Sequence, residues 1–406
     1  MFKFFSNHRT KRTTKYNDKN LVNIYKKRNK MLHLVNRHAT PLFIIDQEVL
    51  KRNLKQLESS CKKNWGPFKI AYSFKTNYEV CKDNFLKKYG VWAEVVSEWE
   101  YKMAIGLGYK GKEIIYNGPA KNHEVLKTAL GDEALVIVEN FQELDDVLAI
   151  AIKNRRKYGI GVRLNLESRS VPTRFGFSIK NNEATHAIKQ VIDNPFLELI
   201  ALHVHTGSDV DDVEKFKNAA ENLADFLNKN HEDLVKLKII DFGGGFPSSG
   251  MAPYGHRNWN PRSINEYVVA ITAVLSKVFK KNRPTLIFEP GRYLVDDAEI
   301  LITKIINSKE SGLRQTLTVD AALTMLPLVQ YRPQIINLYD RKLKSKNARK
   351  METIVYGASP RENDILFKGL LPKAEIGDYL VYFVVGAYNQ SMSSDFIFGK
   401  VKTISI

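Results

Sequence analysis

The sequence predicts a (β/α)8 barrel followed by a smaller all-β domain. Three observations support this prediction. Eight apolar runs of strand length alternate with helical segments between residues 69 and 289, chemically distinctive residues follow several of these runs, and after Tyr293 the alternation gives way to short strands. Eight strands alternating with helices over about 220 residues are typical of this barrel, whose active sites lie at the C-terminal ends of the strands.

The individual elements follow in order from Ala39, where the pattern becomes globular. A strand at 41–46 precedes an amphipathic helix that runs to about Lys62. The expected barrel strands are 69–74, 91–96, 113–117, 135–139, 160–165, 199–205, 237–242 and 285–289, with clear helices at 141–157, 183–193, 212–229 and 264–281. In the third helix Phe216, Ala219, Ala220, Leu223 and Phe226–Leu227 recur at helical spacing.

The C-terminal part reads as strands at 298–307, 315–319, 352–356, 378–385 and 397–405. We therefore expect three parts: a basic, flexible tail (1–36), a cofactor-binding barrel (37–293) whose residues 37–50 pair with the second domain, and a β-barrel domain (294–406).

The positive charge is concentrated in two short segments. The net charge is +18 over 406 residues. Residues 1–30 hold ten Lys or Arg and one acid, Asp18, and residues 341–350 hold six more and no acid, so the rest of the chain carries only three of the eighteen charges. Such runs are usually solvated. Nucleic acid is not an expected partner, although a polyanion-binding arm is the alternative for the tail.

Bulk composition favours a cytoplasmic protein. No apolar run approaches the roughly 20 residues of a membrane span, and the N-terminus lacks the apolar core of a secretory signal. An organelle transit peptide is the alternative for this Arg/Lys-rich segment. The two cysteines, Cys61 and Cys81, have no metal-like spacing, which suits a reducing compartment. We expect no metal site.

Lys75 is the first candidate for chemistry. It ends the buried run 69–74, where an ammonium must be paired or desolvated, and desolvated lysines form Schiff bases readily. The alternative is a strand-capping lysine that reaches solvent.

Other strand ends add compatible groups. His205 ends the sixth run, three glycines (243–245) follow the seventh, and Glu289 and Arg292 in E-P-G-R follow the eighth. Separately these could be a core histidine and two tight turns. Together they offer backbone N–H groups and a guanidinium for a phosphate, a flat ring, a carboxylate and an amine. Pyridoxal phosphate requires this set.

The chain closely resembles the fold-type III pyridoxal-phosphate decarboxylases, the group of ornithine, arginine and diaminopimelate decarboxylases, which share an alanine-racemase-like barrel. The resemblance covers about residues 41–398. Its motifs are Y-S-F-K-T-N (72–77), R-F-G (174–176), H-V-H-T-G-S (203–208), D-F-G-G-G-F-P (241–247), F-E-P-G-R-Y (288–293) and G-A-Y (386–388). It implies a barrel plus a C-terminal β-barrel, a homodimer with active sites at the interface, and an amino-acid substrate.

The resemblance also implies roles for individual residues. Lys75 would bind the cofactor covalently, His205 would stack on its ring, and Glu289 would hold the proton of the pyridine nitrogen; these three are the expected catalytic residues. The remaining cofactor-binding residues, most of them around the phosphate, would be Arg163, Ser208, Gly243, Gly244, Gly245, Gly291, Arg292 and Tyr388. A carboxylate at the pyridine nitrogen favours decarboxylation over racemisation.

One motif departs from the family. The family pattern G-P-x-C-E-S-x-D carries the cysteine that protonates Cα, and the matching stretch here is G-A-S-P-R-E-N-D (357–364), with Pro360 at the cysteine position. The proton donor is therefore open: Ser359, Glu362, a tyrosine or water.

The substrate-reading residues are open as well. Arg332 in Y-R-P is displaced by a few residues from the family's Arg-Pro pair, and Tyr339–Asp340 could read a distal amine. The candidate substrate-binding residues are Arg292, Arg332, Asp340, Arg361, Glu362 and Asp364. We expect an amino-acid decarboxylase; the alternatives are a non-catalytic relative that binds a partner, a racemase or a decarboxylation-coupled oxidase.

Overall fold

The computed structural model describes residues 22–166, 173–230, 234, 237–256 and 258–406. Eight parallel strands form a closed barrel. Around it they are β2 (Phe68–Ser73), β3 (Trp92–Val95), β4 (Ile114–Tyr116), β5 (Leu135–Val138), β6 (Tyr158–Asn165), β8 (Leu197–His203), β9 (Ile239–Asp241) and β10 (Thr285–Phe288). Pairing of β5 with β6 and of β10 with β2 closes the ring, and the two-residue strand β7 (Phe177–Ser178) adds to β6. All eight predicted runs are confirmed.

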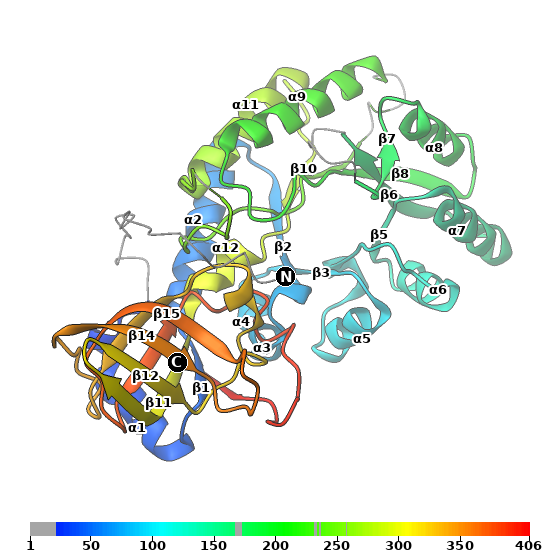
Figure 1. The fold of residues 1–406 in the computed structure, drawn as a ribbon. Helices are drawn as coiled ribbons and strands as arrows, with labels where there is room; N and C mark the ends of the chain where they lie inside the picture. The colour runs from blue at the N-terminus through cyan, green and yellow to red at the C-terminus, as the bar shows by residue number, and fades with distance from the viewer. Residues whose placement is uncertain (1–21, 167–172, 231–233, 235–236, 257) are drawn as a thin grey trace.

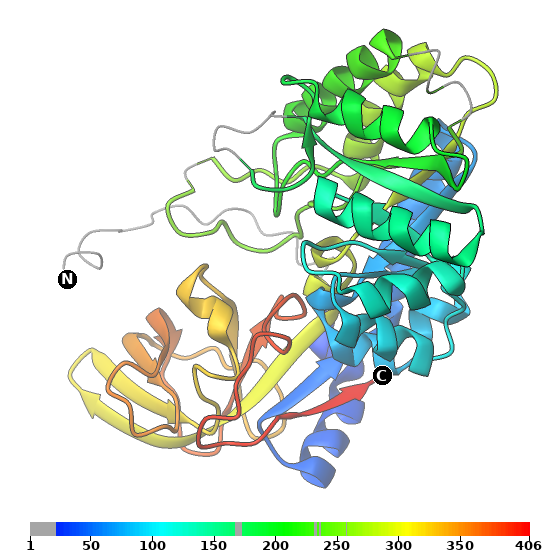
Figure 2. The ribbon, with the colours of Figure 1, turned by 90° about the vertical axis from the view of Figure 1, so that its right-hand side faces the viewer.

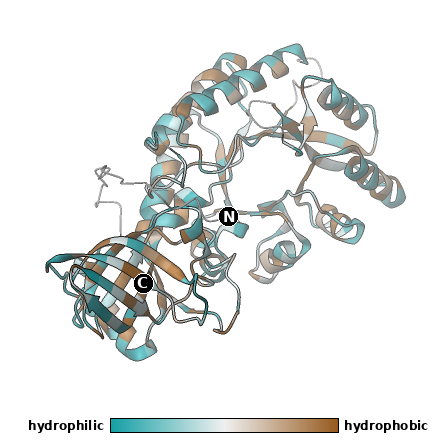
Figure 3. Cartoon of the chain, viewed as in Figure 1, coloured by the Kyte–Doolittle hydropathy of each residue, from teal (hydrophilic) through white to brown (hydrophobic). Residues whose placement is uncertain are grey.

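Helices surround these strands (Figure 1). The longer ones are α2 (Gln47–Asn64), α5 (Glu98–Gly106), α6 (His123–Gly131), α7 (Phe141–Asn154), α8 (Glu183–Ile192), α9 (Val213–Lys229) and α11 (Ile264–Val278), and the short ones are α3 (Tyr78–Lys82), α4 (Phe85–Lys88) and α12 (Arg292–Val295). α9 shows why the pattern predicted helices well. Phe216, Leu223 and Leu227 are buried as their spacing requires, and Asp212 caps the first turn through the backbone N–H of Glu214. Figure 3 shows mixed hydropathy along these helices.

A second, mostly antiparallel sheet follows the barrel. Its strands run in the order β13 (Ile335–Tyr339), β16 (Tyr379–Phe383), β11 (Glu299–Ser311), β12 (Arg314–Val319), β14 (Lys350–Tyr356) and β15 (Ile365–Pro372). The N-terminal strand β1 (Leu42–Ile45) joins this sheet between β11 and β17 (Lys402–Ser405), and Figure 2 shows β1 and the C-terminal strand side by side. β13 and β15 were not predicted, and in β15 an internal Gly369 and a terminal Pro372 obscure the strand pattern.

The ordered fold begins earlier than the sequence suggested. Helix α1 (Ile24–His38) lies within the segment expected as a flexible tail, and its Ile24, Met31 and Val35 are buried. Lys27 pairs with Asp46, the N-cap of α2, at 2.7 Å. The expected tail therefore does not extend to residue 36; residues 1–21 lie outside the described part of the chain. No helix of the described residues is long and apolar enough to cross a membrane.

Candidate active site at the strand ends

Lys75 lies just beyond β2, in the 3-10 turn η2 (Phe74–Thr76), and its side chain is 38% exposed. Its Nζ donates to Ser73 Oγ at 2.7 Å and to Glu94 Oε2, at the end of β3, at 2.5 Å. Burial lowers the pKa of Lys75, but the neighbouring Glu94, Tyr388 and Glu289 outweigh it and raise that pKa to about 12. In the ligand-free protein this side chain is an ammonium held against a buried carboxylate.

Glu289, directly after β10, is a buried carboxylate that stays ionised. Its Oε1 accepts a hydrogen bond from Asn117 Nδ2 at 2.7 Å, and its Oε2 lies 3.3 Å from His203 Nε2. Burial raises the pKa of Glu289, but His203 and then Lys75 outweigh it and lower that pKa to about 2. The negative charge is therefore fixed in a place where water is scarce, which is where electrostatic effects are largest.

Asp241, at the end of β9, has the opposite character. It is fully buried, and burial together with the charge of Glu289 raises the pKa of Asp241 well above its usual range. His203, Asp241 and Glu289 lie close together, with ligand atoms within 4.8 Å of one another. When the pKa values of two neighbouring carboxyl groups differ in this way, one group is protonated and the other is charged. Here Asp241 keeps its proton and Glu289 carries the negative charge.

The glycine loop after β9 packs closely against neighbouring backbone. A Cβ on Gly244 would collide with the carbonyl of Glu289, and one on Gly245, whose φ is +94°, would collide with the carbonyl of Gly207. These two positions need glycine for steric reasons, and Gly245 needs it for its left-handed backbone as well. The loop therefore lies in direct contact with the strand ends that carry Glu289 and His205.

His205 offers a neutral ring. It lies two residues beyond the end of β8, and the backbone N–H of Gly244 donates to its Nδ1 at 3.4 Å. Burial, and after it the charges of Arg163 and His203, hold the pKa of His205 well below its usual range. Arg163 itself pairs with Glu139 at 3.0 Å. An uncharged imidazole suits stacking on an aromatic ring.

Arg292 and Arg332 meet beside this loop. Arg292 lies 3.0 Å from Asp296 and 3.4 Å from Asp209, with its guanidinium 5.2 Å from the ring centre of Tyr388. Arg332, which follows Asp209 by 123 residues in the sequence, bonds Asp209 and lies 3.6 Å from Asp296. The structure thus brings the displaced Arg332 to the same cluster as Arg292, Ser208's neighbour Asp209 and the G-A-Y motif.

Two of the expected substrate-binding carboxylates are already occupied by backbone groups. Asp364 is buried and accepts hydrogen bonds from the backbone N–H groups of Leu323 (2.7 Å) and Ser359 (3.0 Å). Asp340 accepts from the backbone N–H groups of Lys342 and Lys344, each at 2.8 Å. This geometry counts against a substrate role for Asp340 and Asp364, because it gives each carboxylate the task of shaping its own loop.

The other two residues of this group, Arg361 and Glu362, are exposed in the loop that carries Pro360. Arg361 lies over Phe396, 5.9 Å from the ring centre. Their substrate roles stay predictions.

Sequence reasoning missed several members of the site. Asn117 donates to both Glu289 and, at 3.3 Å, Glu94, and it directly follows β4. Asp241 and His203 end β9 and β8. The sequence did carry a signal for these residues. Each is a polar residue at the C-terminal end of a predicted strand, where active sites of this fold lie.

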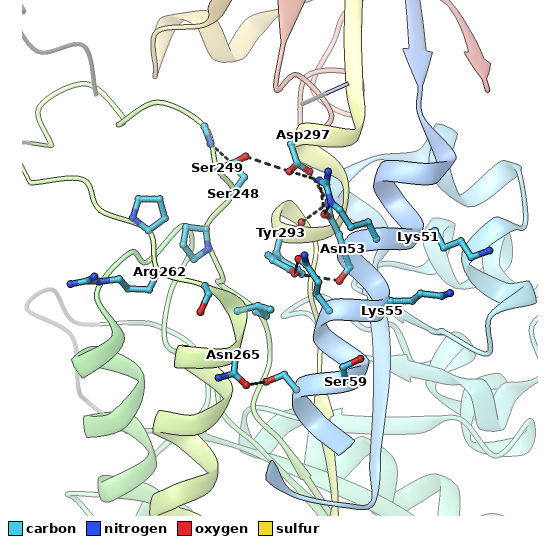
Figure 4. Close-up of a pocket in the computed structure, with 18 of the residues that line it drawn as sticks. Lys51, Asn53, Lys55, Ser59, Ser248, Ser249, Arg262, Asn265, Tyr293 and Asp297 are labelled. Carbon is cyan, nitrogen blue, oxygen red and sulfur yellow. Dashed lines mark hydrogen bonds and ion pairs between the residues drawn. The ribbon is translucent and has the colours of Figure 1, made fainter. Parts of the chain in front are cut away.

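A separate cavity of about 1350 Å³ opens outside the barrel, between α2, the 247–265 segment and Tyr293 (Figure 4). Its wall includes Asp297, whose pKa is raised by burial to about 7 and which accepts from Asn53 at 2.7 Å. Lys75, Glu289 and Arg292 do not line it. We place the chemistry at the strand ends, because the lysine, the ionised carboxylate and the glycine loop meet there.

A barrel that presents these three features at one end is the architecture of an enzyme that uses pyridoxal phosphate. The chain belongs to the pyridoxal-dependent decarboxylases: residues 51–296 match the model of their pyridoxal-binding domain. It is therefore a carboxy-lyase with pyridoxal phosphate as its cofactor, as the sequence predicted.

Its relatives cover nearly the whole chain. It is 25% identical over 383 residues to the diaminopimelate decarboxylase of Methanocaldococcus jannaschii (90% of this chain, 85% of that protein) and 28% identical over 382 residues to that of Methanothermobacter thermautotrophicus (90% and 86%). Among solved structures it resembles the M. jannaschii enzyme with a TM-score of 0.82 (24% identity; 92% of this chain, 88% of that one) and the Helicobacter pylori enzyme complexed with L-lysine with 0.80 (24%; 92% and 93%).

The site fits the cofactor. The close-packed glycine loop leaves no room for side chains between Gly207, Glu289 and its own backbone, which is the kind of cradle a phosphate uses. The ionised Glu289 can accept a hydrogen bond from a protonated ring nitrogen. Lys75 provides an amine on the same rim of the barrel.

The raised pKa of Lys75 gives a pH-dependent prediction. An ammonium must lose its proton before it attacks a carbonyl carbon, so below pH 12 the reactive fraction rises about tenfold per pH unit. Glu94→Gln removes the strongest charge that stabilises the ammonium. We expect this variant to develop the visible absorbance of lysine-bound cofactor about tenfold faster than wild type at pH 8, and the difference to shrink as the pH rises.

The matched control is Glu98→Gln, on the exposed face of α5, where Glu98 pairs with Lys102. It should react at the wild-type rate. A Glu94→Gln variant that is slower than wild type at pH 8 would contradict the assignment of Glu94 as the group that holds the Lys75 proton.

Proposed function

We propose that this chain decarboxylates an amino acid of the diaminopimelate type, with Lys75, His205 and Glu289 as its catalytic residues. The observation that carries the proposal is the hydrogen-bonded chain from Lys75 through Glu94 and Asn117 to Glu289, which spans the strand ends at 2.5–3.3 Å. The names of the relatives support the substrate type.

Each side chain has a task that follows from its state. When bound, pyridoxal phosphate supplies an electron sink for the bonding pair left on Cα as carbon dioxide departs. Glu289 would hold the proton of the pyridine nitrogen there, because the lowered pKa of its carboxyl keeps it a carboxylate. Asp241 and His203 hold Glu289 in place, and the neutral ring of His205 supports the cofactor ring. Lys75, once deprotonated, would supply the amine that holds the cofactor aldehyde.

The phosphate is bound by backbone and by charge. The glycine loop 243–245 would supply the backbone cradle and Arg292 a guanidinium, which lies over Tyr388. The N–H groups of Gly243 and Gly244 already donate to Asp241 and His205, so these two glycines act mainly by holding the loop close to the strand ends. Gly291 lies against Thr76 and fixes the start of α12, from which Arg292 projects. Arg163, paired with Glu139, adds positive charge near His205.

The proposal includes a homodimer with shared sites and a cytoplasmic location. In this homodimer we expect the 357–364 loop of one copy to lie in the site of the other. In that loop Pro360 has no proton to give, so Cα must be protonated by another group, with Ser359 and Glu362 as the nearest candidates in the chain. A non-catalytic role is disfavoured, because a binding module has no use for an ionised buried Glu289 beside a paired lysine.

Product analysis tests the reaction and the missing donor together. Pro360→Cys places a thiol where the resemblance expects one. If Cα protonation limits wild type, this variant should raise the yield of amine per carbon dioxide released, and positioned acids contribute about 10²–10⁴-fold in rate. Diaminopimelate, lysine, ornithine and arginine are the substrates to compare, with carbon dioxide and amine measured in parallel.

The control is Pro360→Ser, which relaxes the backbone without adding an acid of similar strength. Wild type that gives one amine per carbon dioxide, with both variants inactive, would mean that the proline shapes the loop for a different donor. No carbon dioxide from any amino acid would contradict the proposed function itself.

A further inference from the structure

Four charged side chains form a buried, neutral cluster beside the glycine loop. Arg292 and Arg332 face Asp209 and Asp296, and the side chains are 14%, 5%, 13% and 2% exposed, respectively. Arg332 bonds Asp209 and lies 3.6 Å from Asp296, while Arg292 lies 3.4 Å and 3.0 Å from the same two carboxylates. Each arginine is therefore shared between both acids.

The two acids are held very differently. Asp296 is anchored by neutral partners as well: Ser248 Oγ donates to it at 2.5 Å and the backbone N–H of Ala387 at 3.1 Å. Asp209 is held by the arginines. Within the described part of the chain its Oδ1 accepts no hydrogen bond, and its Oδ2 is bonded by Arg332. Asp209 is thus the member of the cluster that can be replaced by another oxyanion at little structural cost.

The arginines also have unused hydrogen-bonding capacity. Arg332 Nη1 is buried and makes no hydrogen bond with any described residue. The guanidinium is held in place from its other side by the Trp259 ring, whose centre lies 5.6 Å away, and Trp259 donates to the carbonyl of Gly250 at 2.8 Å. The acidic oxygen beside Nη1, Asp296 Oδ2, lies 3.6 Å away, which is too long for a hydrogen bond. A buried donor that has an ion pair but no hydrogen bond leaves room for a ligand oxygen to complete its hydrogen bonding.

Asp209 lies where an anionic ligand would have to bind. It follows Ser208, and the next residue, Val210, donates its backbone N–H to the carbonyl of Gly245 at 2.9 Å. Any phosphate or carboxylate that uses Arg292 beside this loop meets the Asp209 carboxylate at short range. A ligand oxyanion would be the third negative charge at this pair of arginines, and both acids would repel it. It therefore competes most directly with Asp209, the acid that the arginines alone hold.

We propose that Asp209 is an internal counter-ion that fills the oxyanion site of Arg292 and Arg332, and that a ligand oxyanion binds there by displacing it. The inference deepens the proposed function and rests on the placement of the cofactor and substrate at these strand ends. The ligand chemistry is a phosphate monoester or a carboxylate. By making the empty site neutral, Asp209 sets how strongly the enzyme binds anions, and it is a specificity-determining residue rather than a catalytic one.

Asp209→Asn tests the proposal with little change in shape. The φ of Asp209 is +56°, and asparagine tolerates this left-handed backbone as well as aspartate does. Full-length protein freed of cofactor is titrated calorimetrically with inorganic phosphate, and cofactor-loaded protein with glutarate, a simple dicarboxylate. We expect the variant to bind at least one of them about tenfold more tightly than wild type, since a neighbouring like charge shifts such equilibria by about one logarithmic unit or more.

The two titrations separate the two sources of the oxyanion. Tighter binding of phosphate assigns the displaced position to the cofactor phosphate, and tighter binding of glutarate alone assigns it to a substrate carboxylate. Asp211→Asn is the matched control, because Asp211 is a nearby carboxylate that pairs with His256 (3.5 Å) and accepts from the backbone N–H of Asn260. It should bind both anions as wild type does.

If Asp209→Asn does not fold, as judged by thermal unfolding, the double variant Asp209→Asn/Arg332→Gln keeps the cluster neutral. It should then bind phosphate about tenfold more tightly than Arg332→Gln alone. Affinities for both anions equal to or weaker than those of the parent protein would overturn the proposal. The phosphate titration needs no turnover, so it gives this answer even if the proposed decarboxylation fails.

Discussion

Lys75→Ala should lower decarboxylase turnover by about 10⁴-fold, the upper end of what a positioned proton-transfer group contributes. The variant loses the amine that binds the cofactor aldehyde, and it leaves Glu94 bonded to Ser73 and Asn117. The fold should persist, because the side chain is 38% exposed and makes its hydrogen bonds at the rim of the barrel. Carbon dioxide release and thermal unfolding, measured on the same preparation, check both parts.

Lys69→Ala is the control for removing a lysine from the same strand. Lys69 is exposed on β2 and lies over Trp92, 5.4 Å from its ring centre, so its loss should leave turnover unchanged. Full activity of Lys75→Ala, with cofactor covalently bound at another lysine, would show that the site has been assigned to the wrong residue.

Glu289→Gln should reduce turnover by about 10²–10³-fold while changing cofactor affinity much less. The substitution keeps the shape and leaves an oxygen to accept the bond from Asn117, but it removes a charge that lies beside His203 in a fully buried place. Preorganised charges of this kind act mainly on the state in which charge develops, and removing one typically costs this much in rate. Turnover and the cofactor dissociation constant are the two quantities to compare.

Glu289→Asp separates charge from position. This variant keeps the carboxylate on a side chain that is one methylene group shorter. We therefore expect it to retain more activity than Glu289→Gln. Equal losses of affinity and turnover in the Gln variant would mean that Glu289 binds the cofactor without tuning its electronics.

The part of the site that could be predicted from sequence lies at the strand ends. The barrel gathers the ends of β2, β9 and β10 at one rim, so Lys75, the glycine loop and Glu289 had to lie near one another once the eight strands were recognised. The strand pattern of the sequence, together with the rule that barrel strands end at one rim, was sufficient to predict these residues as neighbours. The same rule applies to Asn117, because this residue directly follows β4, although it was not predicted as a site residue.

The pairing of Asp209 with Arg332 could not be predicted in this way. Asp209 follows β8 and Arg332 precedes β13 of the second sheet, 123 residues later, and their contact depends on the path of the connecting segments. Helix α1 was missed for a different reason. Its buried face consists of Ile24, Met31 and Val35 in an otherwise basic segment, and the charge obscured the helical spacing.

Covalent attachment of the cofactor at Lys75 can be observed directly by peptide mapping. The purified protein, loaded with pyridoxal phosphate, is reduced with borohydride, digested and mapped by mass spectrometry. We expect a single phosphopyridoxyl adduct on the peptide that contains Lys75, and we expect Lys75→Ala to lose it. An adduct located on a different lysine of the wild-type protein, or a protein that takes up no reducible cofactor, would contradict this expectation.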